Sequence, residues 1–360
     1  MQRSIPCTMM RGGTSKGAYF LASDLPAGTG ERDALLLAVM GSPDPRQIDG
    51  IGGGHPLTSK VAVVSRSTSD SAEVDYLFLQ VQVDAPVVSA EQPCGNILAG
   101  VGPFAIERGL IALAGPITPV RVRMVNTGAL AVIHVPTPHG RVEYRGSTAI
   151  SGVPGTAARI LIDFHDTAGS VAPALLPTGN LVDDVTGTEI TLIDNGMPVA
   201  IVAAADVGVT GYEPPAELES LPSLRERVER LRLESGRLMG LGDVAGTTVP
   251  KVCLVAAPAA GGTLSTRMFI PHRVHTSIGV LAAVTVGTAT AITGTVAARA
   301  AHPLPDVVRL EHPTGWFDAV IDVSSDGGAI RVGRSAIVST ARLLLDGVVF
   351  PREPLMEVPK

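Results

Sequence analysis

Cys94 is the residue whose type and surroundings point most directly to chemistry. It is followed by Gly95 and Asn96, and then by an apolar segment with helical spacing. A cysteine at a helix N-terminus lies near unpaired N–H groups and the positive end of the helix dipole, and both favour the thiolate, which can serve as a base. A free cysteine is more often a small buried hydrophobic residue. This second interpretation suits Cys7 and Cys253, which lie in apolar, strand-like segments.

Two glycine-rich segments precede Cys94 in the chain. RGGTSKG, residues 11–17, formally matches the GxSxG motif of serine hydrolases, but only one short strand is expected before Ser15, whereas that motif follows several strands. Its N–H groups, with Ser15 and Lys16, could instead bind a carboxylate, or the segment could be only a tight hairpin. GIGGGHPLTSK, residues 50–60, lacks the spacing of a nucleotide-binding loop. It is again typical of anion binding, although a lysine such as Lys60 that opens a strand is usually exposed.

Short β-rich segments separated by turns dominate both halves of the chain and must position these residues. In the first half they are Ile5–Met10, Lys60–Ser65, Val74–Val83, Val120–Val125, Ala131–Val135 and Arg159–Phe164. In the second half they are Glu189–Ile193, Val199–Ala204, Lys251–Ala256, Ala319–Val323 and Ala336–Ser339.

Each half also contains one very apolar helix that follows a small polar cluster. CGNILAGVGPFAIERGLI repeats apolar residues at helical spacing and ends near Gly109. Ile278–Ala298, after HRVHTS, carries no charge, but its Ala, Thr and Gly content favours a helix buried inside a domain over a membrane span. Ser223–Leu238 is predicted to be an amphipathic surface helix with a solvated charged face. These patterns predict an α+β fold of two pseudo-symmetric domains, with both apolar helices starting at a shared cleft.

The composition argues against several kinds of partner and cofactor. A net charge of −6 without a Lys/Arg cluster, and only twelve aromatic residues (seven Phe, four Tyr, one Trp), argue against nucleic-acid binding. The three cysteines are too few and too widely spaced for a disulfide framework, and no spacing of His, Cys or carboxylates predicts a metal site. The N-terminus lacks the apolar stretch of a signal peptide. We therefore expect a cytoplasmic, cofactor-independent protein that does not bind membranes. The sequence leaves open whether the protein forms a homodimer.

Eight motifs follow one another along nearly the whole chain: RGGTSKG, IDGIGGGHPLTSK, PCGN, IDNGMP, VPK, HTS, HPTG and TARLLLDG. Together and in this order they resemble the PrpF family, which has the diaminopimelate-epimerase-like fold. The resemblance implies two epimerase-like domains, residues 1–185 and 186–342, each a strand-rich barrel around a central helix. Residues 343–360 would pack back on the first domain. It also implies that the active site lies between the domains.

The resemblance implies a proton shift on an unsaturated tricarboxylic acid, most closely the keto-to-enol conversion of 4-oxalomesaconate in gallate degradation. Allylic isomerisation of 2-methylaconitate or methylitaconate is one alternative, and a non-catalytic polycarboxylate-binding protein is another. The family's catalytic lysine and cysteine fall on Lys60 and Cys94, and sequence leaves open which of them is the base. Diaminopimelate epimerase has a second cysteine before its second helix, where this chain has Thr276 and Ser277. Symmetric two-thiol chemistry is therefore not expected.

The carboxylates of the substrate are expected to be held by polar groups from all of these motifs. The candidates are Ser15, Lys16, Gly52, Gly53, Gly54, Thr58, Gly95, Asn96, Arg267, His275, Thr276, Ser277, Thr314 and Gly315.

Overall fold

The computed structural model describes residues 4–91, 93–326 and 329–352 of the chain. Contacts divide the chain into a first unit, Met1–Ile162 with Ser339–Lys360, and a second unit, Asp163–Val338. Both units mix strands and helices, as the predicted α+β class requires.

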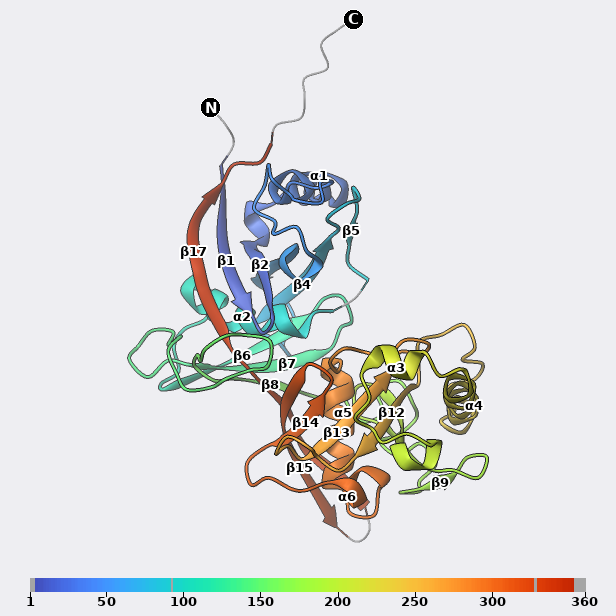
Figure 1. Ribbon diagram of the computed structural model, residues 1–360. Helices are drawn as coiled ribbons and strands as arrows, with labels where there is room; N and C mark the ends of the chain where they lie inside the picture. The colour runs from blue at the N-terminus through green and yellow to red at the C-terminus, as the bar shows by residue number, and fades with distance from the viewer. Residues whose placement is uncertain (1–3, 92, 327–328, 353–360) are drawn as a thin grey trace, which may run out of the picture. The chain divides into compact units, whose positions relative to one another are not determined.

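The first unit is built mainly from strands that flank one long apolar helix (Figure 1). Its elements are β1 (Ile5–Gly12), β2 (Ser15–Leu21), α1 (Thr29–Met40), β3 (Lys60–Arg66), β4 (Val74–Val81), β5 (Val88–Ser89), α2 (Gly95–Glu107), β6 (Ile117–Met124), β7 (Leu130–Pro136) and β17 (Ala341–Val349), with short 3-10 turns at Ala22–Asp24 and Pro56–Thr58. The strand β8 (Ile160–Phe164) runs across the boundary between the units.

Helix α2 is the buried centre of the first unit. Its residues from Ile97 to Ala105 are all buried, because an all-round apolar helix leaves no face for water. It contacts β1, β2, β3, β4, β6, β7 and β17. Helix α1 packs elsewhere in this unit, where Leu36 and Val39 join Ala18 and Phe20 of β2 in one apolar cluster.

The second unit repeats this plan. Its elements are β9 (Asp183–Asp184), β10 (Glu189–Asp194), β11 (Pro198–Ala203), a 3-10 turn at Ala204–Val207, α3 (Pro215–Glu219), α4 (Pro222–Leu238), β12 (Lys251–Ala256), β13 (Leu264–Phe269), α5 (Val280–Ala291), α6 (Val296–Ala300), β14 (Val308–His312), β15 (Gly315–Asp326) and β16 (Ala329–Ser339). The buried helix here is α5, which contacts β10, β11, β14 and β15.

Strand directions follow the same order in the two units. From β1 through β2, β3, β4 and β6 to β7, successive pairs are antiparallel, parallel, antiparallel, parallel and antiparallel. From β10 through β11, β12, β13 and β14 to β15, the order is identical. In chain order, the buried helix comes between the fourth and fifth strands of each series: α2 precedes β6, and α5 precedes β14.

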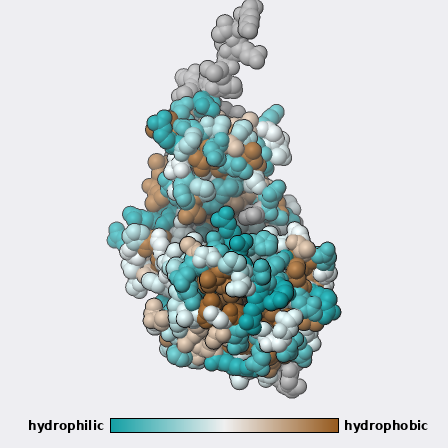
Figure 2. Space-filling model, turned by 45° about the vertical axis from the view of Figure 1, so that its right-hand side comes forward, coloured by the Kyte–Doolittle hydropathy of each residue, from teal (hydrophilic) through white to brown (hydrophobic). Residues whose placement is uncertain are grey.

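The predicted single helix over Ile278–Ala298 is wrong, because the structure divides it into α5 and α6. Gly294 has φ +98, a left-handed conformation that interrupts the helix. The hydroxyl of Thr295 then accepts the N–H of Ala298 and caps the new helix. Among the described residues, no helix is long and apolar enough to cross a membrane. On the face shown in Figure 2, hydrophobic residues lie among hydrophilic ones, which is normal for a folded surface.

The amphipathic helix was predicted correctly over α4, but its charged face is not entirely solvated. Leu224, Val228 and Leu231 are buried as expected. Arg232 is also fully buried: it pairs with Glu229 at 2.7 Å, and its Nη1 donates to the carbonyls of Val244 and Val249. The guanidinium of Arg232 therefore fixes the loop that follows α4 through charge-assisted hydrogen bonds.

Residues 163–185, predicted to belong to the first domain, lie in the second unit. The carboxylate of Asp194 accepts the N–H groups of Val171 and Ala172 at 2.7 Å, and Ala172 packs into that unit's apolar core. These contacts hold the segment against the second set of strands.

Candidate active site

Cys94 is the N-cap residue of α2, with an extended backbone (φ −129, ψ 101) and a partly buried side chain. Its carbonyl accepts the N–H of Leu98 at 3.0 Å and the hydroxyl of Tyr76 at 3.2 Å. The thiol therefore lies where the sequence predicted, at the start of the buried helix. Cys7 and Cys253 are fully buried, which agrees with the structural interpretation of both.

Burial raises the pKa of the Cys94 thiol, although other groups act in the opposite direction. The positive charge of Lys60 lowers this pKa, and so do the backbone N–H groups of Ile97 and Asn96. The expectation that the helix start favours the thiolate is thus right about the forces but wrong about their balance, because loss of hydration outweighs them. For comparison, burial raises the pKa of Cys7 to about 12.

Lys60 is buried, with 9% of its surface exposed, and is not the exposed strand-opening lysine that the sequence left as an alternative. Its Nζ donates to Oε1 of Gln80 at 2.7 Å and lies 5.0 Å from the centre of the Phe78 ring. The Nε2 of Gln80 donates to the carbonyls of Ser59 (2.8 Å) and Pro56 (3.2 Å). Because carbonyls only accept, these bonds keep Oε1 directed at the ammonium group.

Sequence reasoning missed Gln80. It lies directly opposite Lys60 in the antiparallel β3–β4 pair. Residues opposite each other project from the same face of a sheet, so the strand register would have identified it.

The first glycine-rich segment packs closely on Lys60 and on Asn96, two residues after Cys94. It forms the turn between β1 and β2, in which the N–H of Thr14 donates to Oδ1 of Asn96 at 3.3 Å. Gly13 has φ +52, and a Cβ there would lie 2.2 Å from the same oxygen. A Cβ at Gly17 would lie 2.7 Å from the carbonyl oxygen of Lys60. The glycines therefore allow three segments that are distant in sequence to meet.

Alternation along β2 separates Ser15 from Lys16. Ser15, Gly17 and Tyr19 face α2, because the Tyr19 hydroxyl donates to the carbonyl of Ile97 at 2.6 Å and a Cβ at Gly17 would lie 3.0 Å from Ile97 Cδ1. Ser15 is 2% exposed, and its hydroxyl has no hydrogen-bond partner in the described part of the chain. Such a hydroxyl is suited to a substrate carboxylate. The structure does not bring Lys16 together with these groups, since it projects from the opposite face.

The second glycine-rich segment uses its N–H groups inside the protein. The N–H of Gly54 donates to Oε1 of Gln47 at 3.0 Å, and that of Gly52 donates to the carbonyl of Met40 at 3.2 Å. The expectation that these two amides hold a ligand carboxylate is therefore not supported. The Nε2 of Gln47 donates to Oγ of Ser59 at 2.7 Å, so the loop braces the start of β3 instead.

Gly53 and Thr58 belong to the same packing arrangement. A Cβ at Gly53 would lie 2.4 Å from Oγ1 of Thr58. The Thr58 hydroxyl donates to the carbonyl of His55 at 3.1 Å, which leaves its oxygen able to accept but directs its proton into the loop.

A second polar cluster lies before α5 in the second unit. Oγ of Ser277 is 3.1 Å from Nε2 of His312, and the N–H of Ser277 donates to Nδ1 of His275 at 2.9 Å. The hydroxyl of Thr314 donates to the carbonyl of Thr276 at 2.8 Å. Burial lowers the pKa of His275, and it lowers that of His312 to about 4, so both imidazoles are neutral near pH 7. The HPTG motif contains His312, which was nevertheless missing from the predicted site.

The hydrogen bonds of the Arg267 side chain do not connect it to this cluster. Its Nε donates to the carbonyl of Glu213 at 2.6 Å, and its Nη2 and Nη1 donate to those of Tyr212 (2.7 Å) and Thr266 (2.9 Å). These bonds indicate that the guanidinium supports a loop. Gly315, with φ +144, opens β15 at the turn after β14 and has no side chain to contribute.

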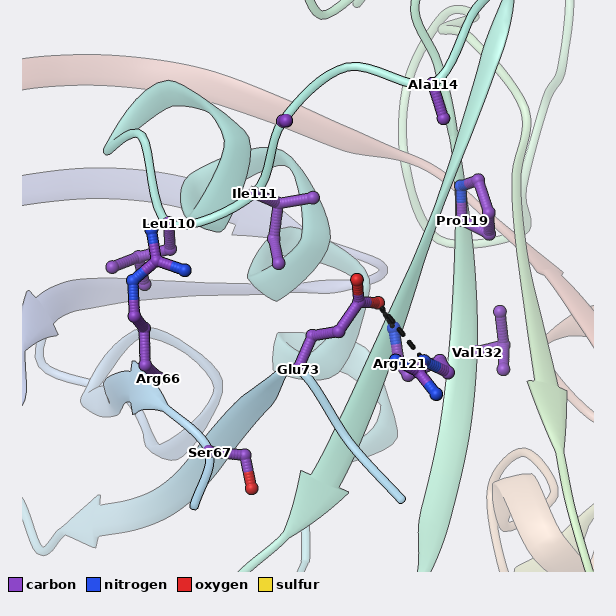
Figure 3. Close-up of a pocket in the computed structure, with 10 residues that line it drawn as sticks. Arg66, Ser67, Glu73, Leu110, Ile111, Ala114, Pro119, Arg121 and Val132 are labelled. Carbon is purple, nitrogen blue, oxygen red and sulfur yellow. Dashed lines mark hydrogen bonds and ion pairs between the residues drawn. The ribbon is translucent and has the colours of Figure 1, made fainter. Parts of the chain in front are cut away.

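The pocket in Figure 3, about 650 Å³ in volume, contains none of the predicted site residues. It is lined by Arg66, Ser67, Glu73, Leu110, Ile111, Ala112, Ala114, Pro119, Arg121 and Val132. The Glu73 carboxylate pairs with Arg121 at 3.4 Å, as Figure 3 shows. The lining of this pocket contains no cysteine and no lysine.

Several known proteins are similar to this chain over nearly its whole length. The chain is 57% identical to a (4E)-oxalomesaconate Delta-isomerase of Novosphingobium sp., over 96% of this chain and 97% of that protein. It is also 57% identical to a 4-oxalomesaconate tautomerase of Pseudomonas putida, over 97% and 96% of the two chains. The crystal structure of a methylitaconate-delta-isomerase has the same fold, with a TM-score of 0.87, 34% identity and full coverage of both chains. Residues 2–352 match the family described as PrpF protein, and the chain belongs to this family.

Proposed function

We propose that this isomerase moves a proton on 4-oxalomesaconate and converts its keto form to the enol, with Cys94 and Lys60 as the catalytic residues. The observation that carries the proposal is the placement of a buried ammonium group close enough to the Cys94 thiol for its charge to lower the thiol pKa. The two relatives at 57% identity, both named for oxalomesaconate, supply the substrate.

The chemistry requires only a positioned base and a group that stabilises negative charge. In the keto form of 4-oxalomesaconate a methylene group lies between a ketone and an alkene, so its proton is acidic and the resulting anion is delocalised. The thiolate of Cys94 removes that proton, and the ammonium group of Lys60 stabilises the enolate and returns a proton to its oxygen. No electron transfer is needed, and no cofactor takes part.

In the first unit, substrate carboxylates are held in this proposal by the unpartnered hydroxyl of Ser15 and the N–H groups of Gly95 and Asn96 at the positive end of α2. The second unit has its own candidate polar groups, which are the Ser277 hydroxyl, the neutral imidazole of His275, Thr276, Thr314 and Gly315. The repeated strand order further leads us to infer that each unit is one epimerase-like barrel around its central helix.

An allylic isomerisation of the same acid is the second candidate, and the Delta-isomerase name of the Novosphingobium relative favours it. The first step is unchanged, because the same proton leaves the methylene carbon. The proton then returns to the distal carbon of the delocalised anion rather than to oxygen. The same two residues serve both outcomes.

Incubation with 4-oxalomesaconate in D2O, followed by proton NMR and enol absorbance, distinguishes these outcomes. The tautomerase produces the enol, whereas the allylic isomerase places deuterium on the distal carbon. Binding without any exchange would indicate a non-catalytic protein, and turnover of methylitaconate alone would contradict the proposed substrate.

Substitution of the two residues tests their roles. Cys94→Ser should lower kcat by about 10²- to 10⁴-fold, the usual contribution of a positioned acid or base, with little change in substrate binding. Lys60→Arg keeps the charge but does not readily release a proton, so it should preserve KM better than kcat. Near-normal turnover by folded Cys94→Ser would rule out the thiol as base.

A further inference from the structure

Three positive side chains lie in a row across neighbouring strands of the first unit. Arg11 of β1 is paired directly with Arg342 of β17 on one side and with Lys16 of β2 on the other. Residues directly opposite in antiparallel strands have Cβ atoms about 4.5–5.5 Å apart and project from the same face. The three cations are therefore immediate neighbours.

This row is unfavourable in the absence of a counter-charge, because like charges directly opposite each other destabilise a sheet. Burial lowers the pKa of Arg11, and the charge of Arg342 lowers it further. Nη1 of Arg11 is fixed by the carbonyls of Gly13 (2.8 Å) and Thr340 (3.1 Å), which orients the rest of the guanidinium. Within the described ranges, no carboxylate forms an ion pair with Lys16 or Arg342.

A pocket of about 790 Å³ lies over these side chains, and all of its lining residues belong to the first unit. A fourth cation, Arg145, lines it from the segment between β7 and β8, and the pocket lining contains no acidic residue. The lining residues are Arg11, Lys16, Tyr144, Arg145, Gly146, Thr148, Ile150, Val153, Pro154, Gly155, Thr156, Ala157, Thr340, Arg342, Leu343 and Leu344.

We propose that this pocket binds a small anion with two or more negative charges, carried by carboxylate or phosphate groups. Guanidinium groups bind both through paired, charge-assisted hydrogen bonds, and a multivalent anion would offset the repulsion along the whole row. The site is distinct from the one that contains Cys94. Lys16 projects from the face of β2 opposite to Ser15, which faces α2.

Isothermal titration with citrate and with inorganic phosphate, at constant ionic strength, tests the proposal on the full-length protein. Arg342→Gln should weaken binding by about tenfold or more, because hydrogen bonds to charged groups are the strong ones. The same variant should melt at a higher temperature than the parent in anion-free buffer, since it relieves the like-charge contact. Whichever anion binds more tightly identifies the charged group. Arg225→Gln is the matched control: Arg225 is exposed on α4, and its loss removes one positive charge elsewhere.

Three results would overturn the proposal. One is unchanged binding of both anions by Arg342→Gln, and another is an equal loss in Arg225→Gln, which would indicate nonspecific attraction. The third is a rise in KM for 4-oxalomesaconate in Arg342→Gln that matches the loss of citrate binding, because the pocket would then be part of the substrate site. Unchanged turnover together with weakened anion binding supports a separate site, whatever the true substrate of the Cys94 site is.

Discussion

The charge of Lys60 is the largest of the contributions that favour the ionised form of Cys94, and burial is the larger effect against it. A thiol in this situation is protonated over most of the neutral range, but once ionised it is a stronger base than an ordinary cysteine. The ammonium group of Lys60 therefore assists ionisation of the thiol, and in the proposed mechanism it also stabilises the anion that the thiolate produces.

Alkylation of the three cysteines measures this balance. Iodoacetamide should label Cys94 before Cys7 and Cys253, because only Cys94 is partly exposed. The midpoint of its pH dependence should lie above the value of about 8.5 for free cysteine. Lys60→Met removes the charge that lowers the pKa, so the midpoint should move to still higher pH. A midpoint below that of free cysteine, or a downward shift in the variant, would contradict the role given to Lys60.

Gln80 is expected to act as a positioning residue for Lys60. Gln80→Leu removes the acceptor of the ammonium group and should lower kcat by about 10²-fold, as small misplacements of catalytic groups do. Gln80→Glu places a carboxylate beside the ammonium group of Lys60. Its negative charge offsets the positive charge that lowers the pKa of Cys94, so the pH at which Cys94 is alkylated should rise. Gln80→Leu should raise that pH as well if Lys60 moves away from the thiol, whereas a merely structural role of Gln80 would leave it unchanged in this variant. Gln82→Leu, at an exposed position two residues further along, should alter neither measurement.

At the level of elements, apolar periodicity was sufficient to predict most strands and all of α2. The strand β2 was not predicted, because SKGAYFL opens with small and polar residues that belong to the glycine-rich turn. The break between α5 and α6 also escaped prediction, since it depends on the left-handed conformation of Gly294 within a uniformly apolar segment. The burial of Arg232 depends on carbonyls more than ten residues away, which no local pattern contains.

The candidate site was predictable only in part for a similar reason. Residue type and position at a helix start identified Cys94. The separation of Lys16 from Ser15 follows from strand alternation, which requires knowing that the segment is a strand. Gln80 and His312 contact predicted residues across strands or turns, so their contribution depends on register.

The glycines of the β1–β2 hairpin should be intolerant of side chains where they contact Asn96 and Lys60. Gly17→Ala places a Cβ 2.7 Å from the Lys60 carbonyl, so β3 must shift. We expect a loss of about 1–3 kcal/mol in the free energy of unfolding, as for other overpacked sites, together with lower kcat. Gly30→Ala, in the first turn of α1 with no atom within 4 Å of the added Cβ, should retain activity and gain up to about 1 kcal/mol. Thermal unfolding and steady-state kinetics of the two variants provide the comparison.

At the scale of the whole molecule, the first unit is built from both ends of the chain. Strand β17 pairs with β1 from Ile5 to Gly12, and Asp346 binds both Arg108 and the hydroxyl of Thr8. The second unit is formed by one continuous stretch, Asp163–Val338.

A chain that ends at Thr340 should therefore lose structure in the first unit alone. Cys7, which lies in β1 and is fully buried, should become accessible to iodoacetamide when its neighbouring strand is missing. Cys253, in β12 of the second unit, serves as the internal control and should stay protected. Mass spectrometry of the labelled peptides reads out both residues, and equal labelling of the two would show that the units do not fold separately.

The return of β17 to the first unit also sets an order for protein synthesis. Multidomain chains generally fold from the N-terminus as they emerge from the ribosome. Here the second unit has all of its residues before the first one does, because the sheet around α2 needs residues up to Val349. The unit that contains Cys94 and Lys60 is thus completed after the other one, and in a nascent chain the surroundings of this thiol stay unfinished until β17 has been synthesised.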